Sequence, residues 1–177
     1  MTNFFELFNI PVSLRPDAAT VKARFYELSR QYHPDRFSTA GPDALSQALA
    51  MAATVNEAYK TLRDPDATMA YVLRLNNMLE DEEKYALPPA FLMEMMDLNE
   101  SVSDYEDNPD NEASRLTAVN SLAEQMQSWQ QAADALISRF DAGNHVQDIL
   151  TPLKDMYFRK KYLLRIQERI NRFAAQL

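Results

Sequence analysis

Residues 30–37 of the chain read Arg30-Gln31-Tyr32-His33-Pro34-Asp35-Arg36-Phe37. The proline in this stretch disfavours helical backbone at the residue before it, so a helix that reaches the stretch must end near Tyr32. The apolar side chains that precede it recur at spacings of four, three and four, namely Val21, Phe25, Leu28 and Tyr32. This is the stripe of an amphipathic helix, which we predict to begin after Asp17 as its N-cap.

A second amphipathic helix is predicted after a polar loop that contains Gly41 and Pro42. Its apolar residues alternate at spacings of four and three, namely Leu45, Leu49, Ala52, Val55, Tyr59 and Leu62. The pattern predicts that these two helices form an antiparallel hairpin, with His33-Pro34-Asp35 in the loop at its tip. We expect two apolar segments to cover the hairpin, namely residues 4–8 and a helix after Asp64-Pro65-Asp66 with Met69, Val72 and Leu73 facing inward.

The second half of the chain is predicted to form three further helices in an antiparallel bundle. The first begins at Pro88-Pro89, with Phe91, Met95, Leu98, Val102 and Tyr105 facing the core. The second buries Leu116, Val119, Leu122, Met126, Trp129, Ala133, Leu136 and Phe140, and ends with Gly143 as its C′ residue. The last runs from about His145 to Phe173 with a kink near Pro152.

The predicted fold class is therefore all-α, with two domains joined by a charged and proline-containing segment. We expect an N-terminal domain over residues 1–79, a linker over residues 80–87 and a three-helix domain over residues 88–177. The run of acidic residues before Pro88-Pro89 marks the boundary, because these charges resist burial and the prolines disfavour a continuous helix.

Scarce glycine and absent cysteine exclude several classes of function. The 177 residues contain two glycines and no cysteine. Phosphate-binding loops need several glycines at fixed offsets, and disulfides, thiolate metal sites and thiol catalysis need cysteine. No apolar run approaches the length of a membrane span, and the first residues lack the basic and apolar pattern of a targeting signal. We expect a cytoplasmic protein without a membrane partner or a cofactor.

The net charge of −8 is distributed unevenly along the sequence. Residues 80–112 hold twelve acidic side chains and one basic side chain, whereas residues 113–177 hold six acidic and nine basic side chains. This pattern indicates an acidic middle segment and a basic C-terminal part, although a solvated linker would account for part of it. Nucleic acid is not an expected partner, because phosphate binding requires concentrated positive charge.

The tripeptide His33-Pro34-Asp35 favours a contact surface over catalysis. No Ser or Cys nucleophile and no second metal ligand stands near it in the sequence, and the other histidine is His145. We therefore assign no catalytic residue and no metal ligand. A purely structural alternative is a proline that stops the helix, with Asp35 capping the turn.

The predicted helix after Pro88-Pro89 carries a second stripe beside its core stripe. This stripe is apolar at one end and acidic at the other, and comprises Leu92, Met93, Met96, Asp97, Glu100 and Asp104. Methionine suits adaptable contact surfaces, so the pattern indicates a partner-binding face. In the alternative interpretation, these methionines pack beneath a neighbouring helix of the bundle.

The tripeptide between a shorter and a longer amphipathic helix resembles the signature of the J-domain. In that family the tripeptide engages an ATP-bound heat-shock chaperone, and basic residues on the preceding helix complete the contact. The resemblance implies a chaperone-binding set in this sequence, namely His33, Pro34, Asp35, Lys22, Tyr26, Arg30 and Arg36. The alternative for the basic residues is an ordinary solvated face.

A J-domain followed by a helical bundle that contains Phe91-Leu92-Met93-Glu94 resembles the HscB family, the J-type co-chaperones of iron–sulfur cluster assembly. The resemblance covers essentially the whole chain and implies that the bundle binds the cluster scaffold IscU. It also implies that the J-domain binds the chaperone HscA and stimulates its ATPase. The implied scaffold-binding residues are Leu92, Met93, Met96, Asp97, Glu100, Asp104 and Phe158, with Tyr157 as the alternative to Phe158.

Two features depart from the family pattern. Asp97 and Asp104 stand where glutamate is expected, which keeps the charge but shortens the reach, and Pro152 interrupts the last helix. Two rival functions stay open. One is a J-domain co-chaperone for a different client protein. The other is a small helical enzyme or ligand carrier, which lacks support because no paired carboxylates or histidine cluster point into the bundle.

Overall fold

The computed structural model describes residues 3–143 and 146–175, and secondary structure within these ranges is entirely helical. The chain divides into two compact units. Unit 1 comprises Met1–Asn77 and Phe140–Asn144, and unit 2 comprises Met78–Arg139 and His145–Leu177. The predicted all-α fold class is confirmed.

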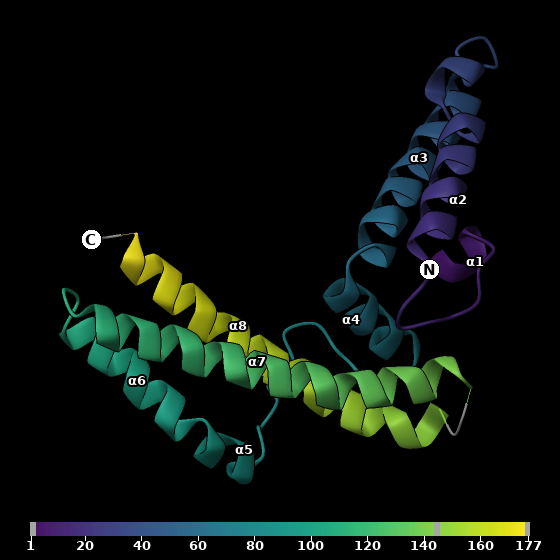
Figure 1. The fold of residues 1–177 in the computed structure, drawn as a ribbon. Helices are drawn as coiled ribbons and strands as arrows, with labels where there is room; N and C mark the ends of the chain where they lie inside the picture. The colour runs from purple at the N-terminus through teal and green to yellow at the C-terminus, as the bar shows by residue number, and fades with distance from the viewer. Residues whose placement is uncertain (1–2, 144–145, 176–177) are drawn as a thin grey trace. The chain divides into compact units, whose positions relative to one another are not determined.

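Unit 1 contains the predicted antiparallel hairpin (Figure 1). Its helices are α1 (Phe4–Leu7), α2 (Ala18–Gln31), α3 (Pro42–Leu62) and α4 (Pro65–Leu75), with a short 3-10 helix (Pro34–Phe37) in the loop between α2 and α3. Helix α3 packs against α2, α4, α1 and the 3-10 helix. The rings of Phe25 and Tyr59 stack across the hairpin at 4.1 Å, and Val21 and Val55 of the same two helices are buried.

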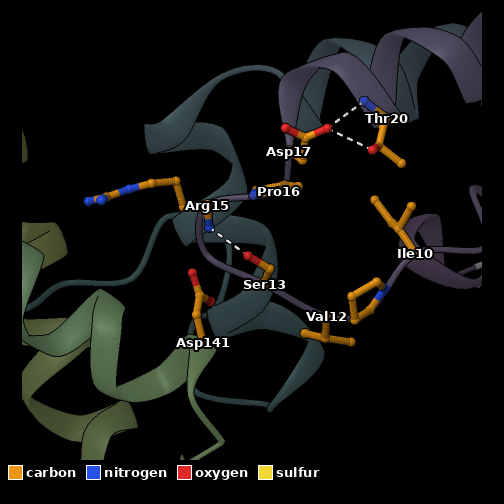
Figure 2. Close-up of a pocket in the computed structure, with 9 residues that line it drawn as sticks. Ile10, Val12, Ser13, Arg15, Pro16, Asp17, Thr20 and Asp141 are labelled. Carbon is orange, nitrogen blue, oxygen red and sulfur yellow. Dashed lines mark hydrogen bonds between the residues drawn. The ribbon is translucent and has the colours of Figure 1, made fainter.

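Helix α2 begins and ends where the sequence predicts. Asp17 has extended backbone and its carboxylate accepts hydrogen bonds from Thr20, at 2.8 Å from the amide and 2.6 Å from the hydroxyl. Figure 2 shows both bonds at the rim of a hollow in unit 1. They lower the pKa of the Asp17 carboxyl. At the other end, the Tyr32 amide closes the last turn on the Leu28 carbonyl, and His33 adopts extended backbone.

The apolar stripe of α3 differs from the prediction at Leu49. Its side chain is 52% exposed, whereas Ala48 is 3% exposed and occupies the inward position one residue earlier. The buried residues of α3 are Ala48, Val55, Ala58 and Leu62. The two alanines are small enough for neighbouring helices to approach closely, and this packing displaces Leu49 to the surface.

Tyr71 anchors the start of the chain inside unit 1. The Phe4 amide donates to the Tyr71 hydroxyl at 2.9 Å, and the two rings stack at 4.5 Å. We expect Tyr71→Phe to keep the stacking but to lower the free energy of unfolding by about 1–3 kcal/mol, because the buried Phe4 amide loses its acceptor. Urea unfolding measures this difference. The exposed Tyr26→Phe serves as the control, and an equal loss in both variants would contradict the anchoring role.

Unit 2 contains α5 (Pro89–Glu94), α6 (Met96–Asp107), α8 (Val146–Ala174) and most of α7 (Glu112–Asp141), whose last two residues belong to unit 1. The single helix predicted after Pro88-Pro89 is therefore two helices. The break falls at Met95, whose side chain is 1% exposed and whose backbone has φ −85° and ψ −2°. The Asn99 side-chain amide donates to the Met95 carbonyl and to the Tyr162 hydroxyl, both at 2.7 Å. This bridge to α8 stabilises the break.

The first turns of α7 also differ from the prediction. Leu116 and Val119 are 45% and 38% exposed, whereas Ala118 and Leu122 are buried. The prediction also omitted Ile137, which is 8% exposed. Over thirty residues the inward face shifts around the helix, so a fixed alternation of threes and fours misassigns its ends. Gly143 adopts φ 74° after the last turn, as expected for a C′ residue.

Helix α8 continues through Pro152, so the last helix is a single helix as predicted, and the kink near Pro152 stays a prediction. Proline removes one backbone hydrogen bond. The side chain of Pro152 is exposed, so its ring causes no clash with the core. Residues 80–87, predicted as a linker, contain no helix and are fastened to α8 within unit 2. The Glu83 carboxylate pairs with the Lys154 ammonium at 2.5 Å, and the Tyr85 ring stacks on Phe158.

Candidate protein-binding surfaces

The tripeptide forms a turn that projects a carboxylate into solvent. His33 is the N-cap of the 3-10 helix, and its Nδ1 accepts a hydrogen bond from the Asp35 amide at 3.3 Å. The Asp35 carboxylate lies 3.6 Å from the same Nδ1 and its side chain is 90% exposed. His33 and Pro34 therefore shape the turn, and the Asp35 carboxylate is exposed to solvent.

Arg36 ties this turn to the end of α2. Its guanidinium donates to the Arg30 carbonyl at 3.2 Å, and the Arg30 Nε donates to the Tyr26 carbonyl at 3.2 Å. The Arg30 carbonyl lies in the last turn of α2, where carbonyl groups lack partners within the helix, so the Arg36 guanidinium satisfies it. The two arginines thus orient the turn relative to α2 while their charges stay exposed.

One face of α2 continues the surface. Lys22, Tyr26 and Arg30 are four residues apart, which places them on the same side of the helix, and all three are exposed. A shallow hollow is lined by Tyr26, Ser29, Arg30 and His33. The structure therefore brings the seven residues of the predicted chaperone-binding set together. We call this set the tip surface: Lys22, Tyr26, Arg30, His33, Pro34, Asp35 and Arg36.

Helices α5 and α6 carry the second surface. Leu92, Met93 and Met96 are 42%, 70% and 64% exposed, so these methionines do not pack beneath a neighbouring helix. The remaining members follow along α6 at spacings of three and four, and their carboxylates are exposed. We call the set the α5–α6 surface: Leu92, Met93, Met96, Asp97, Glu100 and Asp104.

The aromatic residues of α8 have different exposures. Phe158 is 9% exposed, because its ring stacks on Tyr85 at 4.4 Å with an interplanar angle of 4°. Its side chain therefore offers little surface to a partner. Tyr157 is half-buried, and the Lys161 ammonium lies 5.6 Å from its ring centroid. Of the two aromatics considered from the sequence, Tyr157 is the more accessible.

The structure also shows supporting residues that sequence patterns did not reveal. Asn99, Tyr85 and Arg159 contact partners more than sixty residues away in the sequence or across helices. No periodic signal marks such contacts. Among the described residues, no group of three or more His, Cys, Asp or Glu could hold a metal ion. No helix in the described part of the chain is long and apolar enough to cross a membrane.

An ion pair between α6 and α8 predicts acid sensitivity of unit 2. The Arg169 Nε donates to Glu106 at 2.8 Å, and this guanidinium lowers the pKa of the Glu106 carboxyl from its ordinary value of 4.5. A carboxyl with a lowered pKa stabilises the fold above its unfolded pKa and loses this contribution as the pH falls through its folded pKa.

We therefore expect Glu106→Gln to lower the Tm at pH 7, and we expect the difference from wild type to disappear in acid. Thermal unfolding followed from pH 7 to below the folded pKa of Glu106 measures this convergence. Glu124→Gln, at an exposed position of α7, is the matched control. A difference in Tm that stays constant down to the lowest pH would contradict the ion-pair assignment.

Two family models match the chain, and together with the tip surface they define its class. The DnaJ domain model matches residues 3–71, and the model described as the HSCB C-terminal oligomerisation domain matches residues 87–171. A helical hairpin with His33-Pro34-Asp35 at its tip, matched by the DnaJ model, defines a J-domain protein. The second model narrows this class to J-domain proteins that also carry an HSCB C-terminal domain.

Proteins of similar sequence identify the family to which the chain belongs. A co-chaperone HscB homolog of Photobacterium profundum is 34% identical, over 76% of this chain and 86% of the relative. One from Vibrio cholerae is 36% identical, over 71% and 73%. The chain belongs to the HscB family of co-chaperones.

Solved structures agree in fold. The human co-chaperone HscB has a TM-score of 0.76 at 26% identity, over 100% of this chain and 84% of that chain. The chaperone HscB from Vibrio cholerae has a TM-score of 0.72 at 24% identity, over 99% of both chains, and shows the shared fold.

Proposed function

We propose that this J-domain co-chaperone of iron–sulfur cluster assembly acts as an adaptor between two proteins in the cytoplasm. Its α5–α6 surface binds an IscU-type scaffold, and its tip surface binds the ATP-bound form of an HscA-type heat-shock chaperone. The observation that carries this proposal is the presence of two exposed surfaces of different chemistry, one in each unit.

The tip surface supplies charge and shape. The exposed Asp35 carboxylate can accept a charge-assisted hydrogen bond from a chaperone donor. The cationic face of α2 steers the approach to an acidic groove. Docking stabilises the hydrolysis-competent conformation of the chaperone, because a partner that binds one state better shifts the population toward it. The groups that hydrolyse ATP belong to the chaperone, and this chain contributes no catalytic residue.

The α5–α6 surface supplies an apolar anchor with an acidic flank. Leu92, Met93 and Met96 can bury flexible apolar side chains in a scaffold groove. The carboxylates of Asp97, Glu100 and Asp104 pair with basic residues of the scaffold, and this pairing sets the position of the scaffold along α6. The cluster is cargo of the scaffold, so the adaptor needs no ligand set of its own.

Turnover of the chaperone ATPase tests this proposal. Full-length chain and scaffold are added to the HscA-type chaperone separately and together, and phosphate release is measured. We expect the chain alone to accelerate turnover, and we expect chain and scaffold together to accelerate it more than the sum of the separate effects. Tethering raises the local concentration of scaffold at the chaperone. Additive effects would favour the alternative of a different client protein.

A further inference from the structure

Helix α5 presents Leu92 and Met93 on a short and weakly anchored element. It has six residues, and Phe91 is its only buried side chain. A helix this short does not hold its own conformation in water. The orientation of its two exposed apolar residues therefore depends on how Phe91 is seated.

The seat of Phe91 is formed by two residues of α8. The Arg159 guanidinium lies over the Phe91 ring, with its Cζ 4.9 Å from the ring centroid. The Tyr162 ring meets the Phe91 ring edge-on, at 5.6 Å between centroids. The guanidinium covers one face of the ring, a geometry in which cation and ring attract each other.

Arg159 is itself held in place by Asp155, one turn earlier on α8. The Arg159 Nε pairs with Asp155 Oδ2 at 2.6 Å. The other carboxylate oxygen, Oδ1, accepts a hydrogen bond from the Tyr85 hydroxyl at 3.0 Å. The Asp155 carboxylate is thus fixed from both sides, because one oxygen binds the arginine and the other binds the tyrosine.

Tyr85 belongs to the segment that precedes α5, and this segment is fastened to α8. The Tyr85 ring stacks on Phe158. Two residues before Tyr85, the Glu83 carboxylate pairs with Lys154 of α8. Burial and the bond to Asp155 raise the pKa of the Tyr85 hydroxyl, so it keeps its proton and donates at neutral pH. The contacts with Lys154, Phe158 and Asp155 attach residues 80–87 to α8, and the contact with Asp155 links them to Arg159.

We propose that Tyr85, Asp155 and Arg159 form a positioning relay that holds Phe91, and therefore the apolar end of the α5–α6 surface, in the orientation that binds the scaffold. None of the three residues belongs to the α5–α6 surface, so they act through Phe91. The inference rests on the proposed scaffold binding for its functional consequence. Its structural part is independent of any partner.

Amide hydrogen exchange of the free full-length chain tests the structural part. Tyr85→Phe keeps the ring on Phe158 and removes the hydroxyl donor, and Arg159→Met keeps the stem and removes the guanidinium. We expect each variant to raise exchange in residues 90–96 about threefold to tenfold, the range that corresponds to one lost hydrogen bond. Exchange in α7 should not change. Tyr32→Phe, at a half-buried tyrosine in unit 1, is the matched control.

The double variant separates a relay from two independent stabilising contacts. If Tyr85 acts through Arg159, then Tyr85→Phe combined with Arg159→Met raises exchange no further than Arg159→Met alone. Additive effects, or unchanged exchange at residues 90–96 in both single variants, would overturn the proposal.

Isothermal titration of IscU-type scaffold into the same variants tests the functional part. We expect Tyr85→Phe to weaken scaffold binding about threefold to tenfold. Wild-type affinity in a variant with faster exchange would overturn the positioning role. Failure of the wild-type chain to bind the scaffold would instead refute the proposed function, and hydrogen exchange would still decide whether the relay exists.

Discussion

Asp35→Asn is expected to lower stimulation of the chaperone ATPase about tenfold to hundredfold at subsaturating co-chaperone, while leaving scaffold binding unchanged. The side chain is 90% exposed, so its replacement does not disturb the packing of unit 1. Asparagine has nearly the same shape but carries no charge, and a hydrogen bond to a charged group contributes about 1.5–3 kcal/mol. The loss corresponds to a roughly tenfold to hundredfold weaker docking complex. Phosphate release at subsaturating co-chaperone measures it.

Asp43→Asn is the matched control for this prediction. Asp43 is an exposed carboxylate in the first turn of α3, outside the tip surface. The Asp43→Asn variant should stimulate the ATPase like the wild type. This control separates the loss of a contact at Asp35 from the general effect of removing one negative charge. Normal stimulation by Asp35→Asn, with an unchanged circular dichroism spectrum, would show that the tripeptide has been misassigned.

Replacing Met93 and Met96 together by alanine is expected to weaken scaffold binding about tenfold to a thousandfold. Central apolar anchors cost more than 1 kcal/mol each when truncated at an interface, and 1.4 kcal/mol is a factor of ten. The two side chains are 70% and 64% exposed in the free chain, and alanine favours helix, so the Tm should change little. Isothermal titration against the IscU-type scaffold measures the affinity.

Leu116→Ala with Val119→Ala is the matched double control. Both side chains are exposed on α7 of the same unit and outside the α5–α6 surface. This variant should bind the scaffold with wild-type affinity. If both double variants lose affinity equally, apolar exposure in general drives association. Unchanged affinity after loss of both methionines would show that the α5–α6 surface does not bind the scaffold.

The sequence predicted the parts of the fold that depend on local signals. The Asp17 cap, the end of α2 before His33-Pro34 and the positive φ of Gly143 each follow from the backbone preference of one or two residues. Most core positions follow from spacing alone. The exposed face of α5 and α6 was also visible, because its apolar and acidic residues share one side of the helix.

The remaining features depend on packing between distant residues. The family resemblance implies Phe158 as a binding residue, yet Tyr85 covers it from a segment seventy-three residues earlier. The break at Met95 depends on the contact of Asn99 with Tyr162 of α8. Tertiary contacts override local periodicity at such sites, so a pattern within one helix cannot reveal them.

Scarce glycine and absent cysteine are consistent with a division of tasks among three proteins. Two glycines and no cysteine leave this chain without a phosphate loop or a thiolate ligand. In the proposed function, the chaperone binds the nucleotide and the scaffold holds the cluster. The chain provides two binding surfaces and the connection between them.

A mixing experiment tests whether both surfaces must act on one and the same molecule. Asp35→Asn and the Met93→Ala/Met96→Ala variant are added together to chaperone and scaffold, and the scaffold-dependent part of ATP turnover is measured. The mixture holds one intact copy of each surface, but never on the same molecule. We expect this part of the turnover to stay near its level without co-chaperone. Recovery of the wild-type rate by the mixture would contradict the adaptor mechanism.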